Sequence, residues 1–521
     1  MVYQETMQAL FEPAFAKYQS RVAIKYEGRE YTYQHVNQAA NRLSHALQRS
    51  GVGPGDRVAL VMKNCPEFLI SDLAIMKAGA GKVPLNDMLG EREMKYMLQD
   101  SGAKVVIVAP EFYRRVAKMK AELPALKEII AITDDEHLPQ GFTPWSRFTD
   151  GESDENPSPR AIPEDLYILG YTGGTTGNPK GVVHTQRNGY LNLCSHLIET
   201  GMTYGERVLL TTPLPHSAGS FALTGLLRGA TIVLEKAFNP KRVLEQIETE
   251  NITFTFMVPT MIYRVLDELK EANFNVSSLR TIIYGAAPIT AARLKEGLDQ
   301  FGPVFLQFFG QSECPNFITK LEKEDHTLEP GYIHRLRSCG RPVTMTDVQV
   351  VNENAEPVAT GEEGEIICRS PYVMNEYFNL PEKTSETIRD GWLFTGDVGK
   401  IDGDGFVYLL DRKKDMIISG GMNIYTTEVE DVIQKHPDVA QTAVIGVPDE
   451  NWGEMVLAFV IPNGEALKTD ELTSFCKQHL SSYKRPKRFE LTKEFPLTPY
   501  GKIDKKALRK PYWDQQGRSV N

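Results

Sequence analysis

The chain is constrained most by one long alternation, in which short β-branched segments are separated by helical patterns from about residue 20 to residue 310. The segments typical of buried strands are RVALVM, KVVIVAP, EIIAITD, ATIVLE, FTFMVP, TIIYGAA and VFLQFFG. Strands that alternate with helices usually pair in parallel, because each helix serves as the crossover between neighbouring strands. The sequence therefore predicts an α/β fold with parallel-rich sheets.

One helix in this part is especially clear, from Gln34 to Ser50. Its apolar residues recur at helical spacing, and Gly51 stands where a left-handed residue can end the helix. The stripe consists of Val36, Ala40, Leu43 and Leu47.

The pattern changes after about residue 340. Short strands with the turn signals NEN and DGDG run to about residue 411 and predict a small antiparallel β-barrel or sheet. Helices near 427–435 and 470–479 then alternate with the strand-like segments TAVIGVPD and LAFVIP. We expect a large N-terminal domain over residues 1–411, small barrel included, and a smaller α+β domain over residues 412–521.

The composition of the 521 residues limits the class of protein. Apolar residues make up 41%, enough for a sizeable core, and the net charge of −10 opposes nucleic acid or an anionic membrane as the main partner. The uncharged stretch from Val208 to Leu227 is broken by Pro213, Pro215 and His216, so it does not predict an integral membrane segment. With no secretory pattern at the start and six scattered cysteines, we expect a cytoplasmic protein without a zinc site.

The strongest local motif is YTGGTTGNPKG, which follows the strand-like LYIL. Its glycines and threonines form a flexible loop whose amides and hydroxyls can surround phosphate oxygens, and Lys180 adds a positive charge. It is not a Walker loop, because Gly181 rather than Ser or Thr follows the lysine. The motif predicts a site for a phosphate-bearing small molecule.

At this loop the sequence resembles the adenylate-forming (AMP-binding) superfamily, which includes acyl-CoA synthetases, aryl-CoA ligases, peptide-synthetase adenylation domains and firefly luciferase. The family's loop reads YTSGTTGxPKG, and this chain differs once, with Gly173 in place of Ser. The chain looks most like bacterial fatty-acyl-CoA ligases. The resemblance implies ATP, Mg²⁺ and coenzyme A as cofactors and co-substrates. In this loop it implies nucleotide contacts for Thr172, Gly174, Thr175, Thr176, Gly177 and Lys180.

Two later motifs resemble the family's adenine and acyl pockets. GAAPIT resembles the loop that lines both pockets. FFGQSE resembles YGxTE, with Phe309 in place of Tyr and Ser312 in place of Thr; the aromatic ring can still stack on adenine, and serine keeps the hydroxyl. The resemblance makes nucleotide ligands of Gly285, Ala286, Ala287, Phe308, Phe309, Gly310 and Ser312.

Three residues match the family's catalytic positions. Glu313 ends FFGQSE and matches the magnesium-binding carboxylate, a hard oxygen ligand. His216 in PLPHSAGS matches the histidine or aromatic residue beside the substrate carboxylate. Lys502 in PLTPYGKIDKKALR matches the adenylation lysine, which offsets the repulsion between the carboxylate and the α-phosphate.

The region around residue 411 matches the family's ribose site and hinge. Asp397 in GWLFTGD and Arg412 in DRKKD match the residues that bind the ribose, and Lys414 matches the hinge position. Gly420 and Gly421 match a loop beside the thiol tunnel. The resemblance implies that residues 412–521 form a mobile lid.

The substrate is indicated by the segment from Val208 to Leu227, which contains no acidic residue. Family members that activate amino acids place an aspartate there, so an uncharged carboxylic acid is favoured. The apolar part from Ser217 onward suits an acyl chain or an aromatic ring, and the likeness to fatty-acyl-CoA ligases favours a fatty acid.

No carrier domain follows Lys502, so we expect free CoA to be the thiol acceptor. The alternatives are an aryl-acid CoA ligase, a stand-alone enzyme that loads a carrier protein, a luciferase-type oxygenase and a catalytically silent nucleotide-binding protein. The sequence leaves the oligomeric state open, a homodimer included.

Overall fold

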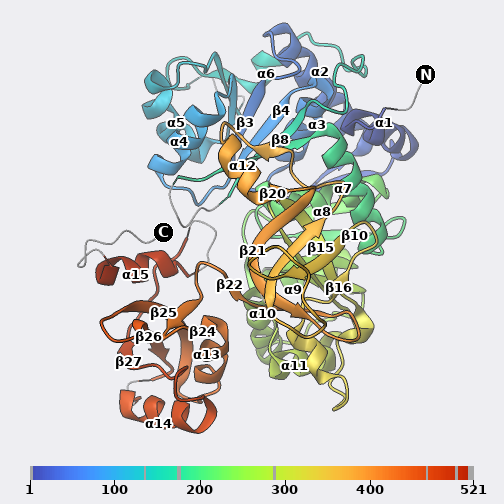
Figure 1. Ribbon diagram of the computed structural model, residues 1–521. Coiled ribbons are helices and arrows are strands. Elements are labelled where there is room, and N and C mark those ends of the chain that lie inside the picture. The colour runs from blue at the N-terminus through green and yellow to red at the C-terminus, as the bar shows by residue number, and fades with distance from the viewer. Residues whose placement is uncertain are drawn as a thin grey trace.

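The computed structural model describes residues 4–133, 137–172, 178–285, 289–464, 467–498 and 503–513. Two large mixed sheets and a small antiparallel sheet form the main body, and a fourth sheet lies in a separate C-terminal unit, residues 417–513 (Figure 1).

The eight-stranded sheet of the main body has the strand order β19-β9-β8-β4-β3-β5-β6-β7. Its centre is parallel, as predicted, and β8, β9 and β19 form an antiparallel edge. The strands are β3 (Arg57–Val61), β4 (Gly81–Leu85), β5 (Val105–Val108), β6 (Glu128–Ala131), β7 (Thr143–Pro144), β8 (Leu166–Tyr171), β9 (Gly181–Thr185) and β19 (Glu376–Tyr377). Its connections include α3 (Pro66–Ala78), α4 (Glu91–Ser101), α5 (Tyr113–Met119) and α6 (Trp145–Phe148).

The nine-stranded sheet has the order β16-β15-β14-β13-β12-β10-β11-β1-β2. It is parallel from β14 to β1 and antiparallel at both edges. The strands are β1 (Val22–Tyr26), β2 (Arg29–Thr32), β10 (Arg207–Leu210), β11 (Thr231–Leu234), β12 (Phe254–Met257), β13 (Thr281–Tyr284), β14 (Phe305–Gln311), β15 (Cys314–Leu321) and β16 (Arg341–Pro342). The predicted strands of residues 20–310 are therefore confirmed.

One core joins the two large sheets. It contains side chains from both sheets and from α1 (Met7–Tyr18), α2 (Tyr33–Arg49), α3, α7 (Gln186–Glu199) and α8 (Gly219–Leu227). The other face of the nine-stranded sheet packs against α9 (Pro240–Glu250), α10 (Pro259–Glu271) and α11 (Ala291–Phe301).

The helix predicted at Gln34–Ser50 is α2. Its predicted stripe is fully buried, the Thr32 hydroxyl caps it by accepting from the His35 N–H, and Gly51 follows with φ +82°. An amphipathic pattern with a cap at each end specified this element locally.

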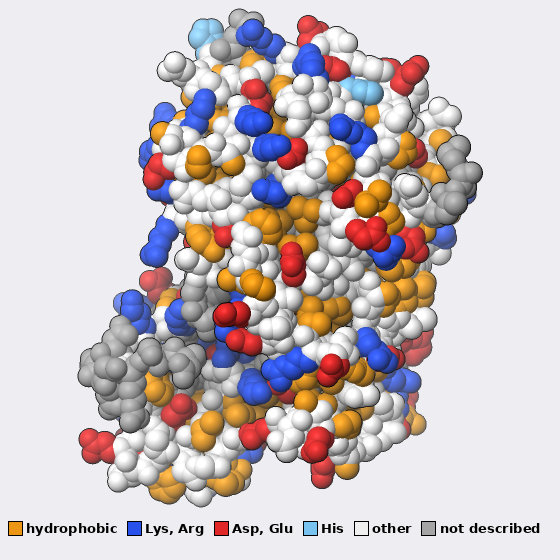
Figure 2. Space-filling view, turned by 45° about the horizontal axis from the view of Figure 1, so that its top comes forward, with side chains coloured by type: hydrophobic (Ala, Val, Ile, Leu, Met, Phe, Trp, Pro, Cys, Tyr) orange, Lys and Arg blue, Asp and Glu red, His pale blue; other side chains and the backbone are white. Residues whose placement is uncertain are grey.

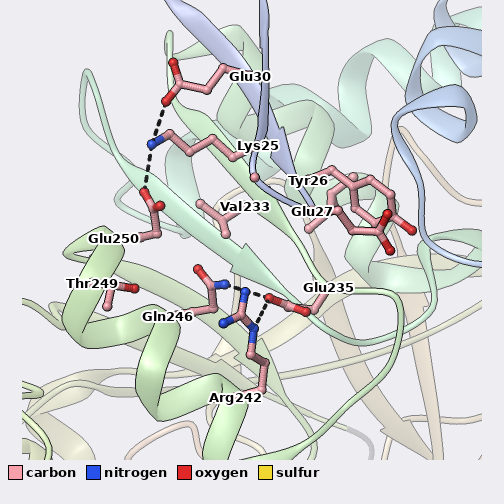
Figure 3. Close-up of a pocket in the computed structure, with 12 residues that line it drawn as sticks. Lys25, Tyr26, Glu27, Glu30, Val233, Glu235, Arg242, Gln246, Thr249 and Glu250 are labelled. Carbon is pink, nitrogen blue, oxygen red and sulfur yellow. Dashed lines mark hydrogen bonds and ion pairs between the residues drawn. The ribbon is translucent and has the colours of Figure 1, made fainter.

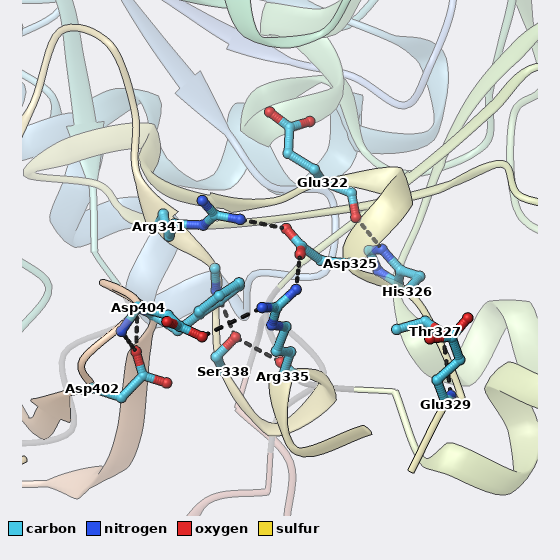
Figure 4. A network of polar contacts seen from close by, with 12 residues as sticks. Glu322, Asp325, His326, Thr327, Glu329, Arg335, Ser338, Arg341, Asp402 and Asp404 are labelled. Atoms are coloured by element: carbon cyan, nitrogen blue, oxygen red, sulfur yellow. Dashed lines mark hydrogen bonds and ion pairs between the residues drawn. The ribbon is translucent and has the colours of Figure 1, made fainter. Parts of the chain in front are cut away.

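The small antiparallel unit predicted for residues 340–411 is a five-stranded sheet. Its strands are β17 (Asp347–Val351), β18 (Gly364–Arg369), β20 (Ile388–Arg389), β21 (Trp392–Ile401) and β22 (Val407–Arg412), and α12 (Pro381–Thr387) precedes β20. Asp325, which is buried, links this sheet to the main body: it pairs with Arg335 at 3.1 Å and Arg341 at 3.3 Å, and Arg335 reaches Asp404 at 3.4 Å (Figure 4).

The C-terminal unit has its own core and is joined to the main body through β22 (Figure 1). Helices α13 (Thr426–Ile433) and α14 (Thr469–His479), close to the predicted ranges, pack on one face of its sheet, and α15 (Lys505–Trp513) packs on the other. The strands are β23 (Ile417–Ser419), β24 (Met422–Ile424), β25 (Val439–Asp449), β26 (Gly453–Pro462) and β27 (Arg488–Leu491).

Positive and negative side chains are interspersed over the face of the molecule drawn in Figure 2. Within the described ranges, none of the helices is both long enough and apolar enough to cross a bilayer. The uncharged stretch from Val208 to Leu227 folds as β10, a π-helical turn at Leu214–Ala218, and α8.

Candidate nucleotide and acid site

The phosphate loop connects β8 to β9, two antiparallel neighbours in which Tyr171 faces Gly181. At the base of the loop the Thr172 N–H donates to the Lys180 carbonyl at 3.0 Å. The tip, Gly173 to Gly177, lies outside the described residues, so the predicted contacts of Gly174, Thr175, Thr176 and Gly177 stay predictions. Lys180 is described and is half-buried, and burial lowers its pKa.

Lys180 and Glu313 come together at a third residue, Tyr377. The Lys180 Nζ lies 3.7 Å from the centroid of the Tyr377 ring, and the Tyr377 hydroxyl donates to Glu313 Oε1 at 2.6 Å. Burial, and secondarily the Glu313 charge, raises the pKa of Tyr377, so this hydroxyl stays a donor. Glu313 itself is buried and keeps a second carboxylate oxygen, a donor atom suited to Mg²⁺.

The FFGQSE motif forms the hairpin between β14 and β15, with an irregular register after Phe309. A Cβ on Gly310 would lie 2.6 Å from backbone atoms of Asn316, so only glycine permits this close approach. Ser312 is exposed, and its carbonyl lies 2.8 Å from Nε2 of the buried His184.

Phe308 and Phe309 are neighbours on β14 with different surroundings. The Phe308 ring is buried against Phe221, Phe256 and Phe317, with ring centroids 5.6 to 5.8 Å apart. The Phe309 ring is partly buried and packs against the small antiparallel sheet. The Phe308 ring is therefore enclosed by other aromatic rings, and its predicted contact with the nucleotide stays a prediction.

Gly285 follows β13, and a Cβ there would lie 2.8 Å from the Phe308 ring. The next two residues of GAAPIT, Ala286 and Ala287, lie outside the described residues.

The predicted ribose ligands Asp397 and Arg412 face each other across β21 and β22. Arg412 Nε and Asp397 Oδ1 are 2.6 Å apart; Asp397 is buried, whereas the Arg412 side chain is partly exposed. The antiparallel register thus creates a carboxylate–guanidinium pair from residues of two different motifs.

The predicted hinge, Lys414, lies in the turn that leads from β22 into the C-terminal unit. Arg509 of α15 holds this turn, because its guanidinium donates to the Lys414 carbonyl at 3.1 Å and pairs with Asp415. Arg509 is 9% exposed, so the clamp is nearly buried.

Gly420 and Gly421 form the two-residue turn of the β23–β24 hairpin, with φ values of +57° and +78°. Both angles favour glycine, as in type I′ hairpins. A Cβ on Gly420 would lie 2.5 Å from the ring of Trp452, which is exposed.

Lys502 lies outside the described residues. Its neighbourhood is partly defined, because Leu497 and Ile503 form an isolated antiparallel bridge and the Asp504 N–H donates to the Pro496 carbonyl at 2.8 Å.

His216 lies within the π-helical turn at non-helical backbone angles, and its side chain is exposed. Its Nε2 is 2.8 Å from the Asn86 amide nitrogen, so the Asn86 side chain fixes the imidazole ring. Asn86 is itself buried and accepts from the Met88 N–H at 2.9 Å.

A chain of hydrogen bonds holds Ser217, the half-buried residue after His216, through the buried side chains of Asn316 and His196. The Ser217 hydroxyl donates to Asn316 Oδ1 at 2.6 Å, Asn316 Nδ2 donates to His196 Nε2 at 2.8 Å, and His196 Nδ1 lies 2.7 Å from the Asn192 carbonyl. The His196 ring also packs against Phe221 and Phe317. This chain holds the His216 turn against α7 and β15.

Burial of two histidines predicts a pH dependence of stability. Burial lowers the pKa of His196 and of His326 to about 4, below the ordinary value of about 6.5. Between these values the unfolded chain binds a proton at each ring and the native chain does not. Stability should fall as the pH drops from about 6.5 toward 4, by about 2 kcal/mol per histidine at pH 5.

The measurement is the urea midpoint at pH 7 and at pH 5. His196→Gln should lose about half of the pH-dependent fall that both histidines cause together. His334→Gln is the matched control, because His334 is exposed. An equal fall in the wild type and His196→Gln would contradict the assignment.

A surface pocket also lies on the nine-stranded sheet, beside the β1–β2 hairpin (Figure 3). Five of its six charged groups are already paired: Lys25 with Glu30 at 2.7 Å and Glu250 at 3.0 Å, and Arg242 with Glu235 at 2.9 Å. None of the predicted site residues lines it.

Sequence reasoning missed Tyr377, Asn86, Asn316 and His196. Asn86 had a usable signal, since a polar residue directly after the buried strand GKVPL lies at the carboxyl edge of a parallel sheet. No comparable signal marked Tyr377, because it is one of 21 tyrosines and its strand β19, with only two residues, is too short to show a pattern.

Two family models match the chain. The model of the AMP-binding enzyme matches residues 11–378, and that of the AMP-binding enzyme C-terminal domain matches residues 428–502. The first alone spans more than half of the chain.

Relatives cover nearly the whole length. The medium/long-chain-fatty-acid–CoA ligase FadD8 of Mycobacterium tuberculosis is 38% identical over 501 residues, 93% of this chain and 86% of the relative. A feruloyl-CoA synthase of Amycolatopsis sp is 38% identical over 497 residues, 94% of this chain and 96% of the relative. The o-succinylbenzoate CoA synthetase MenE of Bacillus subtilis, solved with an acyl-adenylate, has a TM-score of 0.84 and 29% identity, covering 96% of this chain and 97% of that one. The chain belongs to the AMP-binding enzyme family, as an adenylate-forming acid–CoA ligase.

Proposed function

We propose that the chain is an ATP-dependent acyl-CoA synthetase for a carboxylic acid without an ammonium group, with a fatty acid as the favoured substrate. The observation that carries the proposal is that Lys180 and Glu313 both contact Tyr377. The cation of the phosphate loop and a carboxylate suited to a metal therefore lie on the same side chain. A triphosphate with its metal needs both kinds of group.

In the first half-reaction, an oxygen of the substrate carboxylate attacks the α-phosphorus of ATP. The new bond gives acyl-AMP, and the bond to pyrophosphate breaks. Bound Mg²⁺ would neutralise phosphate charge, with Glu313 as its protein ligand. Lys180 would contact the phosphates, Asp397 and Arg412 the ribose, and Lys502 the α-phosphate, while His216 would lie beside the acid.

In the second half-reaction, the CoA sulfur attacks the acyl carbonyl carbon. AMP leaves with the bonding electron pair, and the thiol proton passes to solvent. Gly420 and Gly421 would lie beside the pantetheine arm, since their turn has no side chains to obstruct it.

The fatty acid is favoured because α8 is apolar and because similar chains include fatty-acid–CoA ligases. A second candidate is an aryl acid. It is supported by similar chains, which include a feruloyl-CoA synthase and an indoleacetate–CoA ligase.

A screen of acids by pyrophosphate release, with CoA present, tests the proposal. Medium-chain and long-chain fatty acids should give the highest kcat/KM, and amino acids should give none, because burying an unpaired ammonium in an apolar pocket costs several kcal/mol. A phenolic cinnamic acid as the best substrate would favour the second candidate. An amino acid as the best substrate would refute the argument from α8.

A further inference from the structure

A short segment, Met374–Phe378, ties the exit of the phosphate loop to Glu313; we call it the strap. Its strand β19 pairs with β9, so that Tyr377 faces Val182. The Phe378 N–H donates to the Gly181 carbonyl at 2.8 Å, directly after Lys180, and the Met374 N–H donates to the Glu313 carbonyl at 2.7 Å. The strap therefore fixes the backbones of both functional residues relative to each other.

The Tyr377 side chain makes the second link. Its ring supports the Lys180 ammonium at 3.7 Å from the centroid, and its hydroxyl donates to Glu313 Oε1 at 2.6 Å. The side chain is 3% exposed, and its backbone N–H donates to the Thr384 hydroxyl of α12 at 2.9 Å. The ring thus has little freedom to turn away from either partner.

The ring keeps two opposite charges from neutralising each other. Lys180 and Glu313, both described residues, do not form an ion pair, because the cation lies over the ring face while the carboxylate lies at the ring's hydroxyl edge. A direct Lys180–Glu313 pair would occupy the groups that the triphosphate and its metal need. It would have to break before ATP could bind, which would weaken binding.

We propose that Tyr377 is a positioning residue that holds Lys180 and Glu313 apart and orients the Glu313 carboxylate for the metal of MgATP. The hydroxyl donates to Oε1, so Oε2 would be the oxygen left to hold the metal. The aromatic ring keeps Lys180 directed to the phosphates. This role rests on the proposed function and adds a residue to its site.

Binding of a fluorescent ATP analogue to the full chain, at graded Mg²⁺ and in EDTA, tests the role without catalysis. Tyr377→Phe keeps the ring and loses the hydroxyl, so half-saturation should need about tenfold more Mg²⁺, while affinity in EDTA stays within about twofold. Tyr377→Leu also loses the ring, so affinity in EDTA should fall by about tenfold as Lys180 pairs with Glu313.

Glu313→Gln supplies the reference for loss of the metal carboxylate. Adding Tyr377→Phe to Glu313→Gln should raise the Mg²⁺ requirement no further, because the hydroxyl acts through that carboxylate. Tyr372→Phe is the matched control: this tyrosine is also buried and donates at 2.6 Å, but to the Phe317 carbonyl, so its loss should lower the thermal midpoint and leave the Mg²⁺ requirement unchanged.

Two results would overturn the positioning role while the proposed function stands. One is a Tyr377→Phe protein with the wild-type Mg²⁺ requirement; the other is an additive effect of the two substitutions. A wild-type protein that binds no ATP analogue at any Mg²⁺ concentration would instead refute the proposed function, and the role of Tyr377 with it.

Discussion

Lys502→Ala should abolish acyl-AMP formation while leaving thioester formation from supplied acyl-AMP largely intact. In the first step a carboxylate must approach an anionic α-phosphate, and two unit charges about 4 Å apart repel by roughly 4 kcal/mol at an effective dielectric of 20. A lysine between them offsets this repulsion and stabilises the charge that grows in the transition state. Losing one such group costs about 10²–10³-fold in rate.

Single-turnover assays of the two half-reactions measure this effect separately. Pyrophosphate release with acid and ATP reports the first step, and thioester formation from synthetic acyl-AMP and CoA reports the second. Lys506→Ala is the matched control, because Lys506 is an exposed lysine of the same segment. Equal losses in both steps from a folded Lys502→Ala protein would contradict the separate role.

The fold was predictable where the pattern is local. A complete apolar stripe and a glycine after the last turn predicted α2, and β-branched runs predicted the buried strands. The order of the strands was not predictable, because the position of β1 beside β11 depends on long-range packing rather than on either segment. A two-residue strand such as β19 has no periodicity to detect.

The motifs predicted a set of site residues but not how those residues are arranged. The motifs singled out Lys180, Glu313, Asp397 and Arg412, yet the residue between the first two, Tyr377, comes from a segment without a distinctive pattern. The motif also joined Phe308 to the nucleotide ligands, although its ring lies among Phe221, Phe256 and Phe317. Adjacent strand residues point their side chains to opposite faces, so the motif alone does not tell which of the two rings faces the site.

The turn at Lys414 is where the two half-reactions would be connected. Lys502 must lie at the reacting phosphate in the first step, whereas the thiol must reach the same acyl carbon in the second. One rigid arrangement can hardly serve both, so we propose that residues 412–521 act as a lid that turns about Lys414 and exchanges Lys502 for the Gly420–Gly421 turn. Arg509 belongs to this lid and holds the Lys414 carbonyl and Asp415, so its clamp can move with them.

Lys414→Pro should therefore give the reverse of Lys502→Ala: acyl-AMP formation survives, and thioester formation collapses by about 10²-fold or more. Proline fixes φ near −65° and removes the freedom that a hinge residue uses to pass between two arrangements. Lys414 is the third residue of a turn closed by the Asp415 N–H and the Arg412 carbonyl at 2.8 Å, a position where proline can also strain the turn.

Lys414→Ala separates these effects, since it removes the side chain, leaves φ free and should keep most of the thioester-forming rate. The two half-reactions are measured as for Lys502, with the thermal midpoint of each variant alongside. If Lys414→Pro, folded, forms thioester at the rate of Lys414→Ala, the lid does not turn about this residue.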